Sequence, residues 1–254
     1  MALKKTVEEI NILREGGIIL ASVLKKVAEN VKPGISTKEL DQIAQEQIKE
    51  AGAMPAFLGY KISDSIAPYP SALCTSVDDE VVHGIPRKDK ILKEGQIIGL
   101  DLGIKYKNLF TDSAITVPVG RISPEKQKLI DGARRALYAG IRQVKPGNTI
   151  GDIACAIQEI GERQGFGIIR DLVGHGVGHS IHEPPNVPNY GKAGTLEKLE
   201  IGMVLALEPM FTTGDYHIRF LDDNWTVATA DGSISAHFEH SIAITDKGCI
   251  ILTE

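Results

Sequence analysis

The segment VKPGISTKELDQIAQEQIKEAG (residues 31–52) has a weaker second copy, VKPGNTIGDIACAIQEIGERQG (residues 144–165). Each copy reads as a turn and a helix that begins with a capping box, Ser36 with Glu39 in the first and Thr149 with Asp152 in the second. A longer helical pattern precedes each copy, from Thr6 to about Val31 and from Ser123-Pro124, a cap residue followed by proline at the first helical position. A β-rich region follows each copy. The chain is therefore expected to read helix, helix, sheet, twice over.

The duplication predicts an α/β (α+β) fold of two pseudo-symmetric halves, about 5–120 and 121–254. The halves would share an antiparallel sheet, with the helices outside. A chain of 254 residues can build one large domain or two small ones, and we expect 1–254 to form a single domain. The alternative is that Lys-Pro-Gly-Ser/Thr is a common connector between helices and that the similarity is accidental.

Two acidic residues lie on adjacent strand-like segments. Residues 96–103 and 110–119 flank the polar break KYKN and predict an antiparallel hairpin. If the hairpin is centred between Tyr106 and Lys107, Asp101 and Asp112 oppose each other directly on one face, with Cβ atoms about 4.5–5.5 Å apart. Two carboxylates that close cannot both ionise cheaply without a cation. The alternative to a metal site is a coincidental pair of acids of which one is protonated.

The segment GHGVGHSIHEPP (174–185) holds three histidines in eight positions. On a helix, His175 and His179 could chelate one metal ion. The glycines argue against a helix here, so we expect a loop or a short irregular strand that presents His175 and His182 separately. The alternative is a solvent-exposed turn with incidental histidines.

Two glutamates interrupt apolar runs. Glu208 is the only charge in GMVLALEPMF (202–211), which predicts a strand buried on both faces that ends near Pro209. Glu239 lies in SAHFEHSIAIT (235–245), another strand-like run. A buried glutamate normally has a partner, and an arginine is the ordinary alternative to a metal ion.

Five residues thus form a candidate ligand set: Asp101, Asp112, His175, Glu208 and Glu239. Four carboxylates carry a charge of about −4, which two divalent cations would cancel. Oxygen and nitrogen ligands suit Mn, Fe, Co or Zn better than a thiolate site would. Because the aspartates belong to the first half and the other three to the second, the metal centre is expected at the seam between the halves.

Composition excludes several other classes of protein. Hydrophobic residues make up 43% of the chain and charged residues 24%, with a net charge of −5, as in ordinary globular proteins. No basic stripe for nucleic acid is evident; Arg87, Lys88 and Lys90 form a short cluster that we expect in a solvated loop. There is no apolar run of membrane-spanning length and no signal peptide is expected in MALKKTVEE. Three widely spaced cysteines fit a reducing compartment.

With these residues in this order, the chain resembles the type I methionine aminopeptidases over essentially its whole length. The specific elements are Asp101, Asp112, GHGVGHSIHEPP, LEPMF and FEHS. The resemblance implies the pita-bread fold and a dinuclear metallohydrolase with two divalent metal ions (Co, Mn, Fe or Zn). Such an enzyme removes the initiator methionine from nascent polypeptides when the second residue is small. A cytoplasmic monomer acting near the ribosome is expected, with no nucleic-acid or membrane partner.

The resemblance also implies a role for each site residue. Asp101 would chelate one metal, Asp112 and Glu239 would bridge both, and His175 and Glu208 would complete the other site. His83 in VVHGIP and His182 would be catalytic residues that bind no metal and that contact the scissile amide or the oxyanion, and Glu208 would also carry a proton. The methionine side chain would be bound by Tyr60, Tyr69, Cys74 and Trp225, with Phe57 and Ile181 at positions that vary.

The chain departs from the family pattern in two loops. The segment KISDSIAP (61–68) is longer than in familiar bacterial members, and TGDYHIRFLDDNWT (213–226) is extended. Only 25 residues separate His182 from Glu208, too few for the helical insertion of the type II enzymes. One alternative is a Xaa-Pro peptidase of the same fold, which would usually carry a further N-terminal domain. Another is a metal-free binding module that kept the fold.

Overall fold

The computed structural model describes residues 3–254, and its helices begin at the N-caps that the sequence predicts. Helices α1 and α2 belong to the first half and α3 and α4 to the second, with bounds α1 (Val7–Glu29), α2 (Thr37–Glu50), α3 (Pro124–Ile141) and α4 (Ile150–Gln164). Complete capping boxes form at Thr6, Ser36 and Thr149, and Ser123 caps α3. Helix α4 ends at Gly165, whose positive φ of 75° closes the last turn.

Fifteen strands occur in the described residues. They are β1 (Met54–Pro55), β2 (Leu73–Val77), β3 (Glu80–Val82), β4 (Ile97–Tyr106), β5 (Leu109–Pro118), β6 (Gly167–Ile168), β7 (Gly174–Gly176), β8 (Glu183–Val187), β9 (Val204–Leu207), β10 (Met210–Thr212), β11 (Ile218–Phe220), β12 (Val227–Thr229), β13 (Ser235–His237), β14 (Glu239–Thr245) and β15 (Gly248–Ile251). The central sheet has the order β1-β4-β5-β14-β9-β7-β8, with β2 paired to β4 and β15 to β14. Two three-stranded sheets, β13-β10-β6 and β11-β12-β3, extend it.

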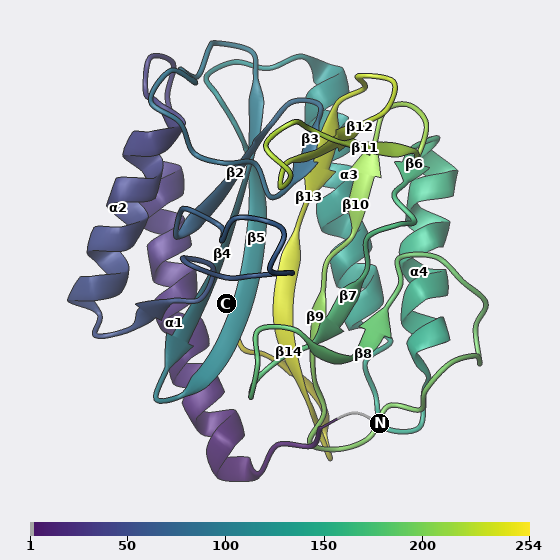
Figure 1. The fold of residues 1–254 in the computed structure, drawn as a ribbon. Helices are drawn as coiled ribbons and strands as arrows, with labels where there is room; N and C mark the ends of the chain where they lie inside the picture. Colours follow the sequence, from purple (N-terminus) through teal and green to yellow (C-terminus); the bar gives the residue numbers. More distant parts are fainter. Residues whose placement is uncertain (1–2) are drawn as a thin grey trace.

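The sheet is antiparallel and curled, and the helices lie behind it in Figure 1, with α1 and α2 to one side and α3 and α4 to the other. Side-chain alternation on β4 explains why the two faces differ. Ile98, Leu100, Leu102 and Ile104 are fully buried in the core that α1 and α2 cover. Asp101, between two of them, points to the opposite face, where the candidate site lies.

The two halves repeat one structural unit, as the sequence predicts. Ser36 forms an isolated bridge with Ile91, and Thr149, 113 residues later, forms the same bridge with Lys198. The second half pairs with the first along β5 and β14, where Asp112 N–H donates to Ser241 Oγ at 2.9 Å. Because Asp112 and Glu239 lie on these two strands, the seam itself carries candidate ligands.

The register predicted for the β4–β5 hairpin is wrong by two residues. Asp101 pairs with Ala114 and Asp112 with Gly103, so the two aspartates are diagonal neighbours on one face and not directly opposed. The physical reason is the turn. Lys107 and Asn108 have φ of 45° and 68°, which makes them the two loop residues of a primed turn; asparagine accepts that conformation readily.

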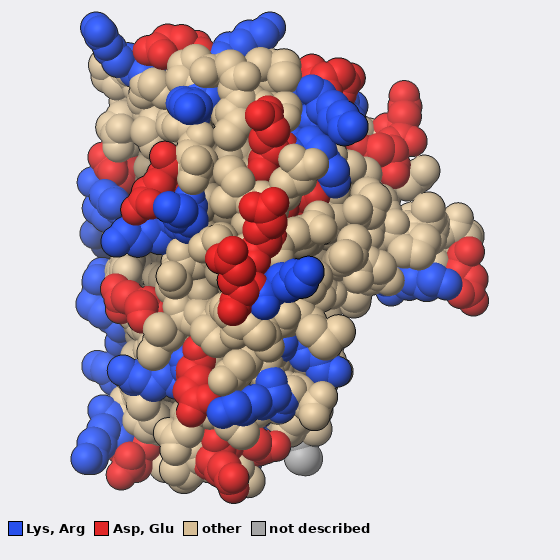
Figure 2. Space-filling model, turned by 90° about the vertical axis from the view of Figure 1, so that its left-hand side faces the viewer, with Lys and Arg blue, Asp and Glu red and all other residues tan. Residues whose placement is uncertain are grey.

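Figure 2 shows the charged side chains on the side of the molecule formed by α2 and α1. Lys and Arg side chains gather along the left edge of this view, and Asp and Glu side chains lie between them and across the rest of the face. None of the helices in residues 3–254 has the length and apolar character that a bilayer crossing requires.

Candidate metal centre and active site

Three overlapping groups of possible metal ligands occur in the described residues, and the five predicted ligands make up two of them; the third joins Asp112 and His175 to His182. Ligand atoms of His175, Glu208 and Glu239 all lie within 4.8 Å of one another, and so do those of Asp101, Asp112 and Glu239. Glu239 belongs to both groups. A carboxylate has two oxygens, so Glu239 can offer an oxygen to each of these two groups.

Each ligand reaches the cluster from a different strand or strand end. Asp101 lies on β4, Asp112 on β5, His175 on β7 and Glu239 at the start of β14. Glu208 follows β9, at the break before Pro209 and β10 that the sequence predicts. The strands are neighbours in the central sheet, so residues up to 138 positions apart (101 to 239) meet on one face.

The carboxylates are buried without the partners that burial requires. Asp101 Oδ1, Asp112 Oδ1 and Glu239 Oε1 have no hydrogen-bond partner in the described residues. No arginine pairs with Glu208 or Glu239 there; His175 at 3.6 Å and His237 at 3.7 Å approach Glu208, and burial lowers the pKa of each to about 3, so neither supplies a positive charge near pH 7. Buried anionic oxygens left unpaired would be costly, and divalent cations would satisfy them. The donor set therefore fits bound metal.

Burial dominates the electrostatics of this cluster. Desolvation, followed by the neighbouring charge of Asp112, raises the pKa of Asp101 well above its ordinary value. Desolvation likewise raises the pKa of Asp112 to about 7 and those of Glu208 and Glu239 well above normal. An adjacent cation would reverse these shifts because it favours the charged form.

The histidine segment adopts the expected irregular conformation. His175 lies on β7 and His182 just before β8, yet their rings meet at 4.4 Å between centroids, closer than separate presentation implies. His175 Nδ1 is 2.8 Å from the carbonyl oxygen of Gly176, so it carries the proton and leaves Nε2 free as a ligand. His179 instead contacts Glu9 on α1 at 2.8 Å, so it does not chelate with His175.

His83 and His182 both line the cavity in front of the carboxylates. His182 Nδ1 is 2.9 Å from the hydroxyl of Tyr60. Desolvation, reinforced by His182, lowers the pKa of His83 to about 4, so the imidazole is neutral near pH 7. A neutral imidazole can donate one hydrogen bond and accept another, which suits contact with a substrate amide or oxyanion.

The cavity joins the ligand cluster to an apolar pocket. Its volume is about 200 Å³, less than the roughly 300–1,000 Å³ of a drug-sized ligand pocket, so it suits one side chain and the bond beside it. Phe57, Tyr69, Cys74, Ile181 and Trp225 form one buried cluster, and Tyr60 packs against it. All the pocket residues predicted from the sequence are thus brought together.

Two features of the site were missed by sequence reasoning. His237 is buried beside Glu208, and its Nε2 has no hydrogen-bond partner within the described residues. Its position two residues before Glu239 in a strand-like run was the signal that could have found it. Ile62, in the longer 61–68 loop, also lines the cavity, as do Leu172 and Val173. No sequence signal distinguishes these three from surface residues.

The fold and the buried Asp/His/Glu cluster define a metallopeptidase. The model of metallopeptidase family M24 matches residues 11–246 of the chain. A methionine aminopeptidase of Aquifex aeolicus is 49% identical over 97% of this chain and 96% of its own length. Methionine aminopeptidase 1 of Bacillus subtilis is 46% identical over 100% of this chain and 99% of its own length. The chain belongs to the methionine aminopeptidases of metallopeptidase family M24.

Solved structures agree with this assignment. The methionine aminopeptidase of Thermotoga maritima superposes with a TM-score of 0.96 at 42% identity over the whole of both chains. That of Rickettsia prowazekii has the same TM-score at 35% identity, again over both whole chains. The prolidase of Pyrococcus furiosus shares the fold, with a TM-score of 0.77 at 24% identity, and this chain covers only 66% of it. The pita-bread fold expected from the sequence is confirmed.

Proposed function

We propose that this chain hydrolyses the peptide bond after an N-terminal methionine, with two divalent metal ions held by the five clustered ligands. The observation that carries the proposal is the pair of ligand groups that share Glu239. Asp101 would bind one ion, Asp112 and Glu239 would bridge both, and His175 and Glu208 would complete the second position. The names of its relatives, methionine aminopeptidases of full matching length, support methionine as the residue removed.

The chain's own residues explain how such a reaction would proceed. Bound metal ions lower the pKa of coordinated water and so supply hydroxide near neutral pH. Glu208, which lines the cavity, would carry the proton from the attacking water to the leaving amine. His83 and His182, on the walls of the same cavity, would donate hydrogen bonds to the scissile amide or to the oxyanion.

The pocket accounts for the choice of methionine. A flexible thioether fills an irregular apolar space well and gains from contact with aromatic rings. Tyr60, Tyr69, Trp225 and Phe57 supply those rings, and Cys74 closes the buried end. Because the cavity is small, we expect a small second residue to be required. Nascent polypeptides are then the natural substrates, encountered in the cytoplasm as they leave the ribosome, and a single-domain monomer suffices for the chemistry.

The first prediction tests ligands and substrate together. Metal-free protein, supplied with Mn, Co, Fe or Zn singly, should release Met from Met-Ala-Ser and little from Met-Lys-Ser or Leu-Ala-Ser. Asp112→Asn and Glu239→Gln should each abolish turnover and lower the bound metal measured by mass spectrometry. Glu125→Gln, an exposed change on α3, should alter neither. Full activity in either ligand variant would exclude the bridging roles.

A further inference from the structure

His83 is held in a backbone conformation that side chains other than glycine seldom adopt. Its φ is 58°, in the left-handed region, directly after strand β3. Such a conformation is strained and persists only where the surroundings impose it. The next residue, Gly84, has no space for a side chain, because a Cβ there would overlap the carbonyl oxygen of Thr75. The surroundings of the Gly84 peptide therefore decide where the His83 imidazole lies.

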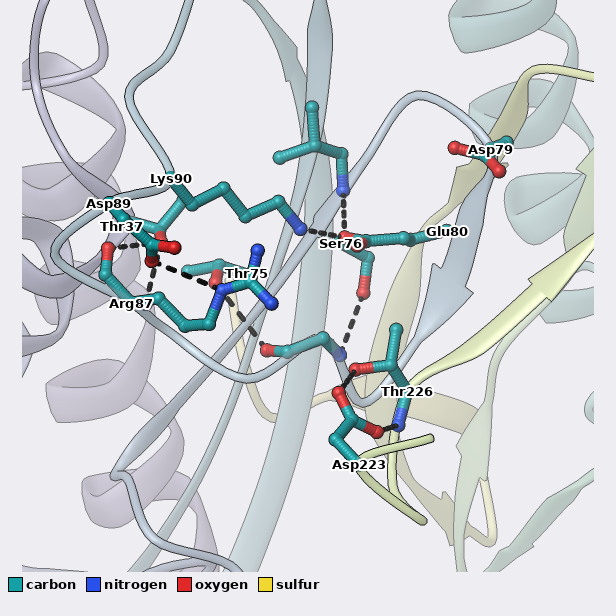
Figure 3. A network of polar contacts seen from close by, with 12 residues as sticks. Thr37, Thr75, Ser76, Asp79, Glu80, Arg87, Asp89, Lys90, Asp223 and Thr226 are labelled. Carbon is teal, nitrogen blue, oxygen red and sulfur yellow. Dashed lines mark hydrogen bonds and ion pairs between the residues drawn. The ribbon is translucent and has the colours of Figure 1, made fainter. Parts of the chain in front are cut away.

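Both backbone groups of Gly84 form hydrogen bonds to β2. Its N–H, in the peptide that follows His83, donates to Ser76 Oγ at 3.3 Å, and its carbonyl oxygen, in the peptide that precedes Ile85, accepts from the backbone N–H of Thr75 at 2.7 Å. Figure 3 shows Thr75 and Ser76 of β2 close to the Glu80–Lys90 ion pair. Strand β2 thus fixes the backbone of Gly84, the residue after His83, by hydrogen bonds.

The Tyr69 hydroxyl contacts the same carbonyl oxygen from the side of the methionine pocket. It is 3.0 Å from the oxygen of Gly84 and 3.3 Å from that of Leu73, and it has one proton to donate. Burial raises the pKa of Tyr69 well above its usual value, so the hydroxyl stays protonated and remains a donor. The Tyr69 ring meanwhile lines the cavity and meets Trp225 edge-on at 5.2 Å between centroids.

We propose that Tyr69 is a positioning residue for His83, and that through its hydroxyl the wall of the methionine pocket holds the catalytic imidazole in its strained conformation. The inference rests on the proposed function. Methionine recognition and the placement of His83 then share one side chain. A substrate side chain that packs on the Tyr69 ring would steady the ring and, with it, the Gly84 peptide.

The test is Tyr69→Phe, which keeps the ring and removes only the hydroxyl. One hydrogen bond is worth about 0.5–1.5 kcal/mol, so kcat for Met-Ala-Ser should fall roughly 2- to 10-fold while KM and bound metal stay near wild type. In a His83→Ala background the same change should have no further effect, because its target is gone. Tyr138→Phe, whose hydroxyl contacts His240 and Glu254 away from the cavity, should leave kcat unchanged.

Ring resonances of the histidines give a second measurement that needs neither metal nor substrate. In NMR spectra of the metal-free protein, Tyr69→Phe should shift the His83 signals and leave those of His240 in place. The inference is overturned if Tyr69→Phe keeps wild-type kcat, or if it slows the His83→Ala enzyme by the same factor as the wild type. If the wild-type protein releases no methionine at all, the proposed function fails instead, and the NMR result still decides the contact.

Discussion

At the scale of single residues, the histidines of the site separate into two kinds. His175 is oriented by the carbonyl of Gly176 with Nε2 toward Glu208, as a metal ligand should be. His83 lines the cavity but is absent from the ligand groups found in residues 3–254. Two different consequences of substitution follow.

His83→Ala should lower kcat by about 10²–10³-fold, the usual loss when one donor to a developing oxyanion is removed. KM should change less, and bound metal should stay constant. His175→Ala should lose metal as well as activity. Steady-state kinetics with metal analysis on both variants checks this. Loss of metal from His83→Ala would make it a ligand, and wild-type kcat would make it structural.

The lowered pKa of His83 also predicts how stability depends on pH. The unfolded chain binds a proton at His83 below about pH 6.5, whereas the folded protein binds it only below about 4. Stability from this group is therefore complete above pH 6.5 and is lost as pH falls toward 4. Acidification from pH 7.5 to 4.5 should cost the metal-free protein about 2–3 kcal/mol more than it costs His83→Gln. Urea unfolding at both pH values measures this; equal losses would contradict the burial of His83.

At the scale of elements, the 61–68 segment borders the pocket. It lies in front of the sheet in Figure 1 and projects from the outline of the molecule on the right of Figure 2. The indole N–H of Trp225 donates to the carbonyl oxygen of Ala67 at 2.9 Å, and Ile66 packs on the pocket cluster. The loop therefore forms part of the pocket wall.

Trp225→Phe should loosen this wall while it keeps an aromatic ring in the pocket. KM for Met-Ala-Ser should rise about 2- to 10-fold, because the hydrogen bond from the indole to Ala67 is lost, and kcat should change less. Ser63→Ala, at the tip of the loop where the hydroxyl contacts Ser65 alone, is the matched control. An unchanged KM in Trp225→Phe would show that the loop does not shape the pocket.

At the scale of the whole molecule, a buried ion pair ties the start of the chain to the second half. Lys5 Nζ contacts Glu183 Oε1 with side chains only 1% and 3% exposed, at the beginning of β8 and next to His182. The backbone N–H of Lys5 also donates to the carbonyl oxygen of Gly202 at 2.7 Å. The segment before α1 therefore packs on the second half, beside the start of β8.

Lys5→Met should lower the free energy of unfolding by about 3–5 kcal/mol, because it leaves the Glu183 carboxylate buried without a partner. Lys4→Met is the matched control: the Lys4–Glu200 pair is about half exposed, and such pairs contribute about 1 kcal/mol or less. Lys5→Met/Glu183→Gln should recover most of the loss. Equal destabilisation by Lys4→Met and Lys5→Met, measured by urea unfolding, would contradict this account.

The sequence by itself determined the features that depend on local chemistry. Ser36 and Thr149 predict capped helices because an N-cap interacts only with the first turn of its own helix. Glu208 predicts a ligand because an isolated charge in an apolar run needs a counterion. The hairpin turn is equally local: Asn108 accepts the left-handed conformation readily, and this preference places the turn at Lys107 and Asn108. Only the tertiary structure decided that His237 lies beside Glu208, that Tyr69 reaches Gly84 and that Lys5 meets Glu183. These contacts join residues between 15 and 178 positions apart, and no local propensity encodes them, because each depends on how segments outside a single helix or strand pack against each other.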